Sequence, residues 1–359
     1  MISTFKCSPS NIKTNKVLKN KKGRFFTVDI HCHTHLEKAD RIVQSLYNPK
    51  TDPIFGFASE KSREVNRQQM ATLHSKLTSI QDRLADMDAS GIDVQAISPA
   101  PHQYYYWAPD EVGRDAARIV NDSIAEIVSM HPDRFVGIGT VPLQNPKMAI
   151  VEMLRAVKKL GLRGIEIGTN VNGIELSDAR YHKFFATAQE LGILIFMHPL
   201  GTTEGKRLSE HYLVNIVGNP MDSTIAVSNL IFEGVLEKYP KLKMCIAHGG
   251  GYLPSYAGRM EHAYHARPDC RQCLTHPPSR SLKKLFFDTI VFDPLHLKFL
   301  VDQYGSKHVM MGTDYPYDMS EANPVEFVQS SDLSLLERKD ILGINAARLL
   351  GIRNRALRF

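Results

Sequence analysis

Eight short apolar runs alternate with helical patterns along most of this 359-residue chain, and this alternation limits its possible folds more than any other feature. The strand-like runs lie near residues 25–33, 94–100, 134–143, 164–169, 194–200, 243–251, 285–291 and 309–316. Between most of them, apolar residues recur at helical spacing, at 77–90, 109–131, 147–160, 179–191, 222–238 and 294–304. Strands that alternate with helices pair in parallel, and eight such units favour a closed (β/α)8 barrel, the α/β fold called a TIM barrel.

An open, doubly wound sheet is the alternative that the same alternation allows. When such a sheet binds a dinucleotide, a Gly-x-Gly-x-x-Gly motif follows its first strand. No such motif follows the run at 25–33. The barrel is therefore the predicted fold, and its catalytic residues are expected at the carboxyl ends of the strands.

The barrel is predicted to occupy residues 27–359 as a single domain. Its first connection, 36–76, is unusually long and contains Pro49, Pro53 and Gly56, so it is expected to be a lid or cap over the barrel mouth. Residues 1–26 are predicted to be a basic, disordered arm without the apolar core of a secretory signal. Seven cationic side chains precede the first acidic residue: Lys6, Lys13, Lys16, Lys19, Lys21, Lys22 and Arg24.

Composition excludes several classes of protein. The chain is 43% hydrophobic and 23% charged, as in ordinary globular proteins, and it has no run of 18 apolar residues that would predict a membrane span. Its net charge of +6 is modest and belongs largely to the arm, so nucleic-acid binding or targeting remains a minor alternative for that segment. Five scattered cysteines, an odd number, predict a reducing compartment, and we expect a cytoplasmic protein.

Candidate metal ligands stand at the ends of four apolar runs. His31-Cys32-His33 ends the first run, and alternation along a strand places both imidazoles on one face, about 7 Å apart. His198, His248 and Asp314 each end a run of their own. Two histidines on one strand are weak support for a metal site, but convergence of four strand ends makes it the favoured interpretation.

The residue types indicate the chemistry. Three imidazoles and a carboxylate, from His31, His33, His198 and Asp314, suit zinc with one position open for water or substrate, and such a water becomes acidic enough to be a nucleophile. His248, followed by three glycines, is either a further ligand or a general acid/base; its ordinary pKa near 6.5 favours the second role. The alternatives are a capping or core histidine for His198 and a turn residue for Asp314.

Several segments resemble the amidohydrolase-related metal-dependent decarboxylases. The resemblance spans about 27–352, is strongest from 194 to 317, and rests on Val28–His33, Met197–Pro199, Phe232–Gly251 and Gly312–Tyr317. It implies a (β/α)8 barrel with one zinc ion, or manganese, held by His31, His33, His198 and Asp314. It also implies that His248 is the acid/base that activates metal-bound water, and that an unsaturated or aromatic acid loses CO2 without an organic cofactor. Strand 4 (Gly164–Gly168) has no lysine, in keeping with a mononuclear site.

The resemblance also suggests how a carboxylate substrate is held. Arg259 matches a family arginine that reaches into the neighbouring subunit's site, which implies a homodimer; the alternative is a solvated helix arginine. A second family arginine lies in the long first connection, where Arg63 is preferred and Arg67 competes. Arginine suits this role because its planar fork binds a carboxylate through two hydrogen bonds.

Aromatic residues are candidates for the wall of the site. Trp107 ends the segment 102–107, which is aromatic enough to face a flat conjugated substrate or to pack under a lid. Tyr317 stands where the family often has phenylalanine, and Leu200 where it often has tryptophan. These two differences leave the substrate open.

A separate cluster of His265, Cys270, Cys273 and His276 could be a structural zinc site or a polar loop. A second Cys-x-x-Cys is missing, so the polar loop is favoured.

The leading function is a metal-dependent, non-oxidative decarboxylase. The alternative is a hydrolase or hydratase of the same scaffold, acting on a lactone, an amide or an unsaturated diacid. A catalytically silent barrel is the least favoured, because all five strand-end residues are intact.

Overall fold

Eight parallel strands form one sheet in the order β1-β2-β3-β4-β7-β8-β9-β10. The computed structural model describes residues 25–48, 56–201 and 205–353. The strands are Val28–Thr34, Val94–Pro99, Phe135–Gly139, Gly164–Ile167, Leu194–Met197, Lys243–Ile246, Phe286–Asp288 and Val309–Met310, in that order. Hydrogen bonds from Ile30 N to Met311 O (2.9 Å) and from Asp314 N to His31 O (2.8 Å) join β1 to the segment after β10, so the predicted (β/α)8 barrel is confirmed.

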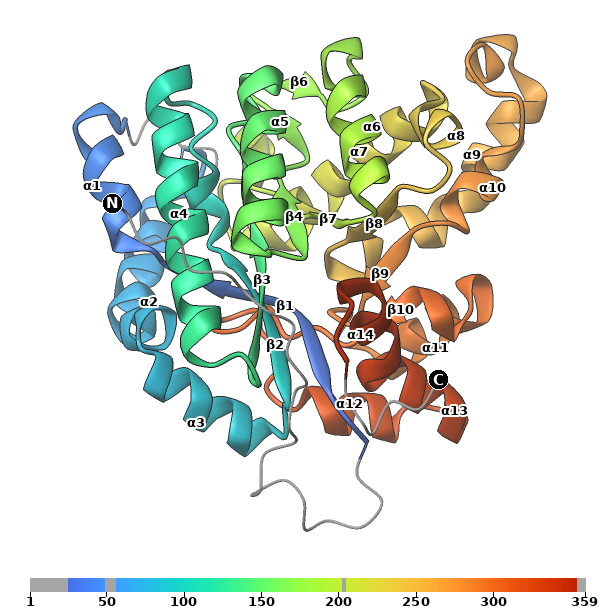
Figure 1. Ribbon diagram of the computed structural model, residues 1–359. Helices are drawn as coiled ribbons and strands as arrows, with labels where there is room; N and C mark the ends of the chain where they lie inside the picture. Colours follow the sequence, from blue (N-terminus) through green and yellow to red (C-terminus); the bar gives the residue numbers. More distant parts are fainter. Residues whose placement is uncertain (1–24, 49–55, 202–204, 354–359) are drawn as a thin grey trace.

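Helices surround the strands, as Figure 1 shows. They are α1 Glu37–Val43, α2 Glu60–Thr78, α3 Ile80–Ser90, α4 Asp110–Met130, α5 Pro146–Arg155, α6 His182–Leu191, α7 Asn219–Phe232, α8 Val235–Lys238, α9 Leu253–Ala266, α10 Pro278–Leu282, α11 Pro294–Tyr304, α12 Pro324–Ser330, α13 Leu335–Lys339 and α14 Asn345–Leu350. A small antiparallel pair, β5 (Asn170–Val171) and β6 (Ile174–Glu175), follows β4. The six predicted helical patterns therefore correspond to real helices, with shifts at their ends.

Local sequence explains why these helices start where they do. Asn145 precedes α5 and accepts a hydrogen bond from Met148 N (3.1 Å), which satisfies a backbone donor of the first turn. Asp110 and Glu111 begin α4, where negative charge is favourable to the helix dipole. Along α4, the apolar residues at helical spacing are buried and pack toward β3, so the helix covers one side of the barrel.

The connection after β1 differs from the predicted loop. Its described part holds α1 and α2, and Ser59 caps α2 by accepting from Ser62 N at 3.3 Å. The two prolines that suggested a loop, Pro49 and Pro53, precede α2 and lie outside the described residues, as do residues 1–24 of the arm predicted at 1–26. The predicted helix 77–90 is also divided, because Ser79 is extended (ψ 117°) and caps α3 by accepting from Asp82 N.

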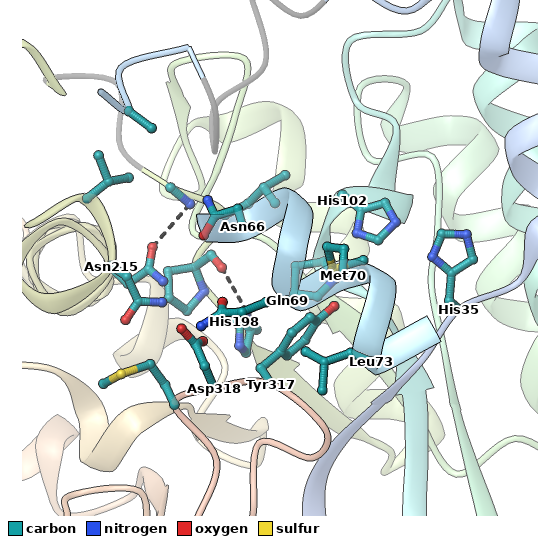
Figure 2. Close-up of a pocket in the computed structure, with 18 of the residues that line it drawn as sticks. His35, Asn66, Gln69, Met70, Leu73, His102, His198, Asn215, Tyr317 and Asp318 are labelled. Atoms are coloured by element: carbon teal, nitrogen blue, oxygen red, sulfur yellow. Dashed lines mark hydrogen bonds between the residues drawn. The ribbon is translucent and has the colours of Figure 1, made fainter. Parts of the chain in front are cut away.

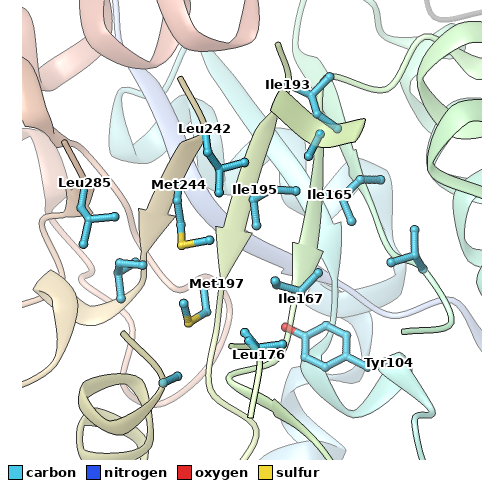
Figure 3. Packing of buried hydrophobic residues seen from close by; sticks show 14 of the residues in the cluster. Tyr104, Ile165, Ile167, Leu176, Ile193, Ile195, Met197, Leu242, Met244 and Leu285 are labelled. Carbon is cyan, nitrogen blue, oxygen red and sulfur yellow. The ribbon is translucent and has the colours of Figure 1, made fainter. Parts of the chain in front are cut away.

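Alternate side chains of each strand enter two buried apolar clusters. On β7, Ile195 and Met197 pack with residues of the surrounding helices, whereas Leu194 and Phe196 join the cluster that also holds Cys245 and Met310. Figure 3 shows the helix-facing cluster, with Ile165 and Ile167 of β4 beside the β7 residues. Because both faces of the strands are buried, their sequences are continuous apolar runs.

After β1, the observed strands end earlier than the predicted runs. β8 stops at Ile246 and β10 at Met310, although apolar residues continue beyond both. The segments that follow leave the regular hydrogen-bond ladder and turn inward, and they carry His248 and Asp314. The extra predicted length is thus the part of the chain that builds the site.

Candidate active site

Four predicted ligands converge at one end of the barrel. His31 and His33 lie on β1, His198 follows β7, and Asp314 follows β10. One ligand atom from each lies within 4.8 Å of the others, and all four residues are buried. The structure thus brings together the four residues that the strand ends predicted.

The spacing of these atoms suits a cation. His31 Nε2 lies 3.1 Å from His33 Nε2, and Asp314 Oδ1 lies 3.3 Å and 3.2 Å from these two nitrogens. Two ligands bonded to one tetrahedral zinc ion are about 3.3–3.5 Å apart, because each bond is about 2.0–2.2 Å long. The observed distances therefore fit a shared ion.

Each imidazole turns its Nε2 toward the centre because its Nδ1 is engaged elsewhere. His33 Nδ1 donates to Pro99 O (3.0 Å), and His198 Nδ1 donates to Pro199 O (2.7 Å). A carbonyl oxygen only accepts, so both Nδ1 atoms carry the proton and each Nε2 keeps a lone pair. His31 Nδ1 is held by the carboxylate of Asp288 at 2.6 Å, the usual outer partner of a metal-binding histidine.

Two buried atoms at the centre have no hydrogen-bond partner among the described residues: His198 Nε2 and Asp314 Oδ1. Buried polar atoms are nearly always partnered, and a cation between them would satisfy both. Burial lowers the pKa of His198 well below its usual range, so the ring is uncharged, as a ligand must be. Burial by itself raises the pKa of Asp314, but His31, His248 and His33 outweigh burial and lower the pKa well below its usual range. The group therefore stays ionised.

Glycine is required where the chain packs against this centre. A Cβ on Gly312 would stand 2.9 Å from Cβ of His31, closer than side chains approach. Asp314, two residues later, has a positive φ of 59°, a conformation that L-residues rarely adopt outside functional sites. Gly312 and the strained Asp314 together place the carboxylate over the histidines of β1.

His248 lies beside the centre but outside the four-atom cluster. Its Nε2 is 3.4 Å from Asp314 Oδ2, and its Nδ1 has no hydrogen-bond partner among the described residues. Its backbone, also at positive φ (57°), donates to Asp288 Oδ2 at 3.0 Å. Gly249 follows because a Cβ there would stand 2.3 Å from Val291 Cγ1. The arrangement fixes the backbone of His248 and leaves the Nδ1 atom of its ring without a partner among the described residues.

A cavity of about 700 Å³ opens onto this centre. His198, His248, Asp314 and Tyr317 line its inner part, and the ring of Tyr317 lies 5.5 Å from that of His33. Apolar and aromatic side chains line much of the rest, several of them from α1 and α2: Val43, Tyr47, Met70, Leu73, Trp107, Leu200, Val214 and Met319. Figure 2 labels Met70 and Leu73 of this wall, together with polar lining residues such as Asn66 and Gln69. The predicted wall residues Trp107 and Tyr317 both face the cavity.

The predicted substrate arginines do not line the cavity of this chain. Arg63 is exposed on α2 and donates to Gly56 O (3.3 Å), and Arg67, also exposed, binds Glu64. Arg259 is exposed on α9. Among the described lining residues, Arg41 of α1 is the one arginine.

Three residues near the site were missed by the strand-end argument. Asp288 ends β9 and so follows the same rule as the ligands. His35 comes one strand step after His33, and His102 lies in the turn after β2. Both histidines line the cavity, so the alternation that singled out His31 and His33 could have been carried one step further to His35.

The alternative that the separate His/Cys cluster between residues 265 and 276 is a structural zinc site is wrong. In the described part of the chain, His265, Cys270, Cys273 and His276 do not form a group with ligand atoms close together. His265 lies near Glu261, and Cys273 Sγ contacts Glu233 Oε2 at 3.8 Å. These contacts fit the polar loop that the sequence favours for this segment. Across the described residues, the helices are too short or too polar to span a membrane.

Several decarboxylases are similar to this chain in sequence or in fold. A 2-amino-3-carboxymuconate-6-semialdehyde decarboxylase of Dictyostelium discoideum is 38% identical over 272 residues, covering 75% of this chain and 76% of that protein. The solved 5-carboxyvanillate decarboxylase of Sphingomonas paucimobilis superposes with a TM-score of 0.82 at 22% identity, covering 92% of this chain and 100% of that one. A dihydroxybenzoic acid decarboxylase of Polaromonas, solved with manganese and 2-nitroresorcinol, has a TM-score of 0.79 at 23% identity, with coverage of 94% and 100%.

The family assignment rests on almost the whole barrel. The sequence profile described as amidohydrolase matches residues 28–352, which include all four candidate ligands and His248. The chain therefore belongs to the amidohydrolase family.

Proposed function

We propose that this protein is a metal-dependent, non-oxidative decarboxylase, a carboxy-lyase, of an unsaturated or aromatic carboxylic acid. The observation that carries the proposal is the four-ligand cluster with His248 beside it at the inner end of an aromatic-lined cavity. The 38% identity to a 2-amino-3-carboxymuconate-6-semialdehyde decarboxylase supports a substrate of that general kind. The hydrolase or hydratase alternative has less support, since the relative that is 38% identical to this chain is a decarboxylase.

We assign one divalent cation to His31, His33, His198 and Asp314. Zinc suits three imidazoles and one carboxylate, and manganese is the alternative because it is present in a related solved structure. When bound, the ion supplies Lewis acidity toward the substrate's oxygen atoms. The residues themselves keep its surroundings rigid through the contacts of His31 to Asp288, of His33 to Pro99 and of His198 to Pro199.

His248 is assigned the proton transfer that the reaction requires. Loss of CO2 leaves an electron pair on carbon, and a proton must take its place. The imidazole of His248 is placed next to Asp314 with Nδ1 unpartnered among the described residues, so it can accept and deliver that proton. Trp107 and Tyr317 then hold the flat part of the substrate.

We also propose that the active unit is a homodimer. Among the described residues, Arg41 of α1 is the one arginine that lines the cavity of a single chain, and we propose that Arg259, which is exposed on α9, reaches a neighbouring subunit as a further carboxylate clamp. The 36–76 segment, which already lines the cavity through α1 and α2, is assigned the role of a lid. Arg63, or Arg67, would contact substrate only if the start of α2 moved toward the cavity.

A cytoplasmic location is part of the proposal. The four cysteines in the described residues are all unpaired: Cys32, Cys245, Cys270 and Cys273. Unpaired cysteines are typical of reducing compartments.

Isotope labelling tests the reaction class. Metal-loaded protein is incubated with 2-amino-3-carboxymuconate-6-semialdehyde, 2,6-dihydroxybenzoate and 5-carboxyvanillate, in deuterium oxide and separately in ¹⁸O-labelled water. We expect one of these acids to release CO2 and to gain one deuterium on carbon, without ¹⁸O in the organic product. A product that contains ¹⁸O and retains all its carbon would instead establish a hydrolase or hydratase.

A further inference from the structure

A second group of polar side chains lines the same cavity away from the proposed metal centre. His35 follows β1, Asp40 lies on α1, and His102 lies in the turn after β2. Their polar atoms lie within 4.8 Å of one another, and the two imidazole rings are 4.9 Å apart. Three separate segments therefore converge on this part of the wall.

Asp40 holds His35 in a fixed orientation. Its Oδ2 accepts from His35 Nε2 at 2.5 Å, and its Oδ1 accepts from Gln103 Nε2 at 3.2 Å and from the hydroxyl of Tyr105. Both carboxylate oxygens are thus engaged by donors of the protein. The carboxylate orients the imidazole as the carboxylate of a catalytic triad orients its histidine.

The spacing distinguishes this group from the metal centre. At the centre, ligand atoms are 3.1–3.3 Å apart and His198 Nε2 has no partner among the described residues. In the second group, a hydrogen bond joins His35 Nε2 to Asp40 Oδ2, so a proton already occupies the position between these two atoms. A cation would have to displace that proton, and the second group fits a hydrogen-bonding role better.

His102 is the member of this group whose ring has unused hydrogen-bonding capacity. In the described part of the chain, its ring makes no hydrogen bond, although it lies against His35 and faces the cavity. Burial, with the neighbouring His35, lowers the pKa of His102 to about 4, while Asp40 acts in the opposite direction. An uncharged imidazole offers one donor and one acceptor, the combination that a hydroxyl group matches.

The position along β1 sets the distance from the reacting group. His35 comes two residues after His33, which is about 7 Å along an extended chain. Figure 2 draws His35 and His102 on the far side of Met70, Leu73 and Tyr317 from His198. This separation is of the order of one aromatic ring with a substituent opposite its carboxylate.

We propose that His102, together with the Asp40-braced His35, forms a subsite that binds an uncharged hydroxyl group at the end of the substrate remote from the carboxylate that is lost. The placement of that carboxylate rests on the proposed function. The subsite gives acids with a hydroxyl group at that end a preference of one hydrogen bond and places the apolar wall against the ring between the two polar ends.

Binding of unreactive probe pairs tests this subsite. Calorimetry measures the affinity of zinc-loaded protein for benzoate against 4-hydroxybenzoate, and for 2-naphthoate against 6-hydroxy-2-naphthoate. In the wild type, we expect the hydroxyl to tighten binding by about 5- to 10-fold in at least one pair, the effect of one hydrogen bond. In His102→Phe, which keeps a ring of similar size, that preference should fall to about one.

His182→Phe is the matched control, because His182 contacts Lys238, neither of these residues lines the cavity, and the substitution should leave the preference unchanged. Equal preference in wild type and His102→Phe, or no preference in the wild type, would overturn the subsite. So would a second zinc ion per chain that disappears in His102→Phe. These readouts need no turnover, so a preference that depends on His102 supports the subsite even if isotope labelling shows no decarboxylation.

Discussion

Asp288 holds His31 through an Nδ1–Oδ2 hydrogen bond of 2.6 Å between two fully buried side chains. The same oxygen accepts from the backbone N–H of His248, and Oδ1 accepts from that of Gly249. Burial raises the pKa of Asp288, but His31 and the neighbouring donors lower it below its usual range, so the group is ionised. One carboxylate thus positions both His31, a proposed metal ligand, and His248, the proposed acid/base.

Replacing this carboxylate should weaken metal binding without removing a ligand. In Asp288→Asn, His31 loses an ionised partner, and we expect metal affinity to fall roughly 10- to 100-fold, the usual effect of an outer partner. Competition with a chelator measures it. Asp302→Asn, on the exposed side of α11, is the control and should bind metal as the wild type does. Unchanged affinity in Asp288→Asn would show that the contact is not needed for binding.

The metal centre should hold about one divalent ion per chain. His33→Ala removes one of four ligands and opens the buried centre, so the ion should be lost. Elemental analysis of protein purified without chelator gives the content of both proteins. Two ions per chain that survive the substitution would contradict the mononuclear site.

His248 should matter for turnover and not for metal content. His248→Ala removes the proton-exchanging ring but none of the four converging ligand atoms, so metal content should stay near that of the wild type. We expect kcat to fall by roughly 10²-fold or more, the range for loss of a general acid/base. A metal-free variant would make His248 a ligand and our assignment wrong.

The shared-site dimer can be tested by complementation. His248→Ala and Arg259→Ala homodimers should each be nearly inactive. After subunit exchange, one site of the heterodimer carries both substitutions and the other carries neither, so activity should return toward half that of the wild-type dimer. Mass measurement verifies the exchange. If exchanged protein stays inactive, Arg259 does not act across an interface.

The stability of the protein should depend on the protonation of His102. The folded pKa of about 4 lies below the ordinary value of 6.5, so the unfolded chain binds more protons between these two pH values. The free energy of unfolding should therefore be highest above about pH 6.5 and decrease as the pH falls toward 4. His102→Gln should flatten this part of the curve.

Urea unfolding of both proteins, freed of metal, gives the comparison. His35, Asp40 and His33 also face His102, but they are present in both proteins. Parallel curves for wild type and variant would show that His102 keeps an ordinary pKa.

The rule that catalytic residues lie at strand ends was enough to predict most of the centre. His31, His33, His198, His248 and Asp314 each end an apolar run, and the structure brings all five together. Asp288 obeys the same rule, but the apolar residues Ile290 and Val291 follow it, so it seemed internal to a longer strand. Where apolar sequence outlasts the strand, periodicity alone misplaces the end.

Other features depend on contacts that no local pattern encodes. The meeting of Asp40 with His102 requires α1 to lie beside the turn after β2, and these residues are 62 positions apart in the sequence. The long connection read as a loop because of Pro49 and Pro53, while its helix-forming residues begin only after them. Arg259 is exposed on α9, and its proposed role depends on contact with a second subunit.

The cavity has walls of two different origins. Strand ends of the barrel supply the proposed metal ligands and His248, whereas α1 and α2, from the connection after β1, supply much of the apolar wall and Asp40. Changes of sequence within this connection can therefore alter which acids fit the cavity without moving a proposed ligand or His248. A relative that kept the barrel residues and had a different sequence in this one segment would keep its chemistry and accept different substrates.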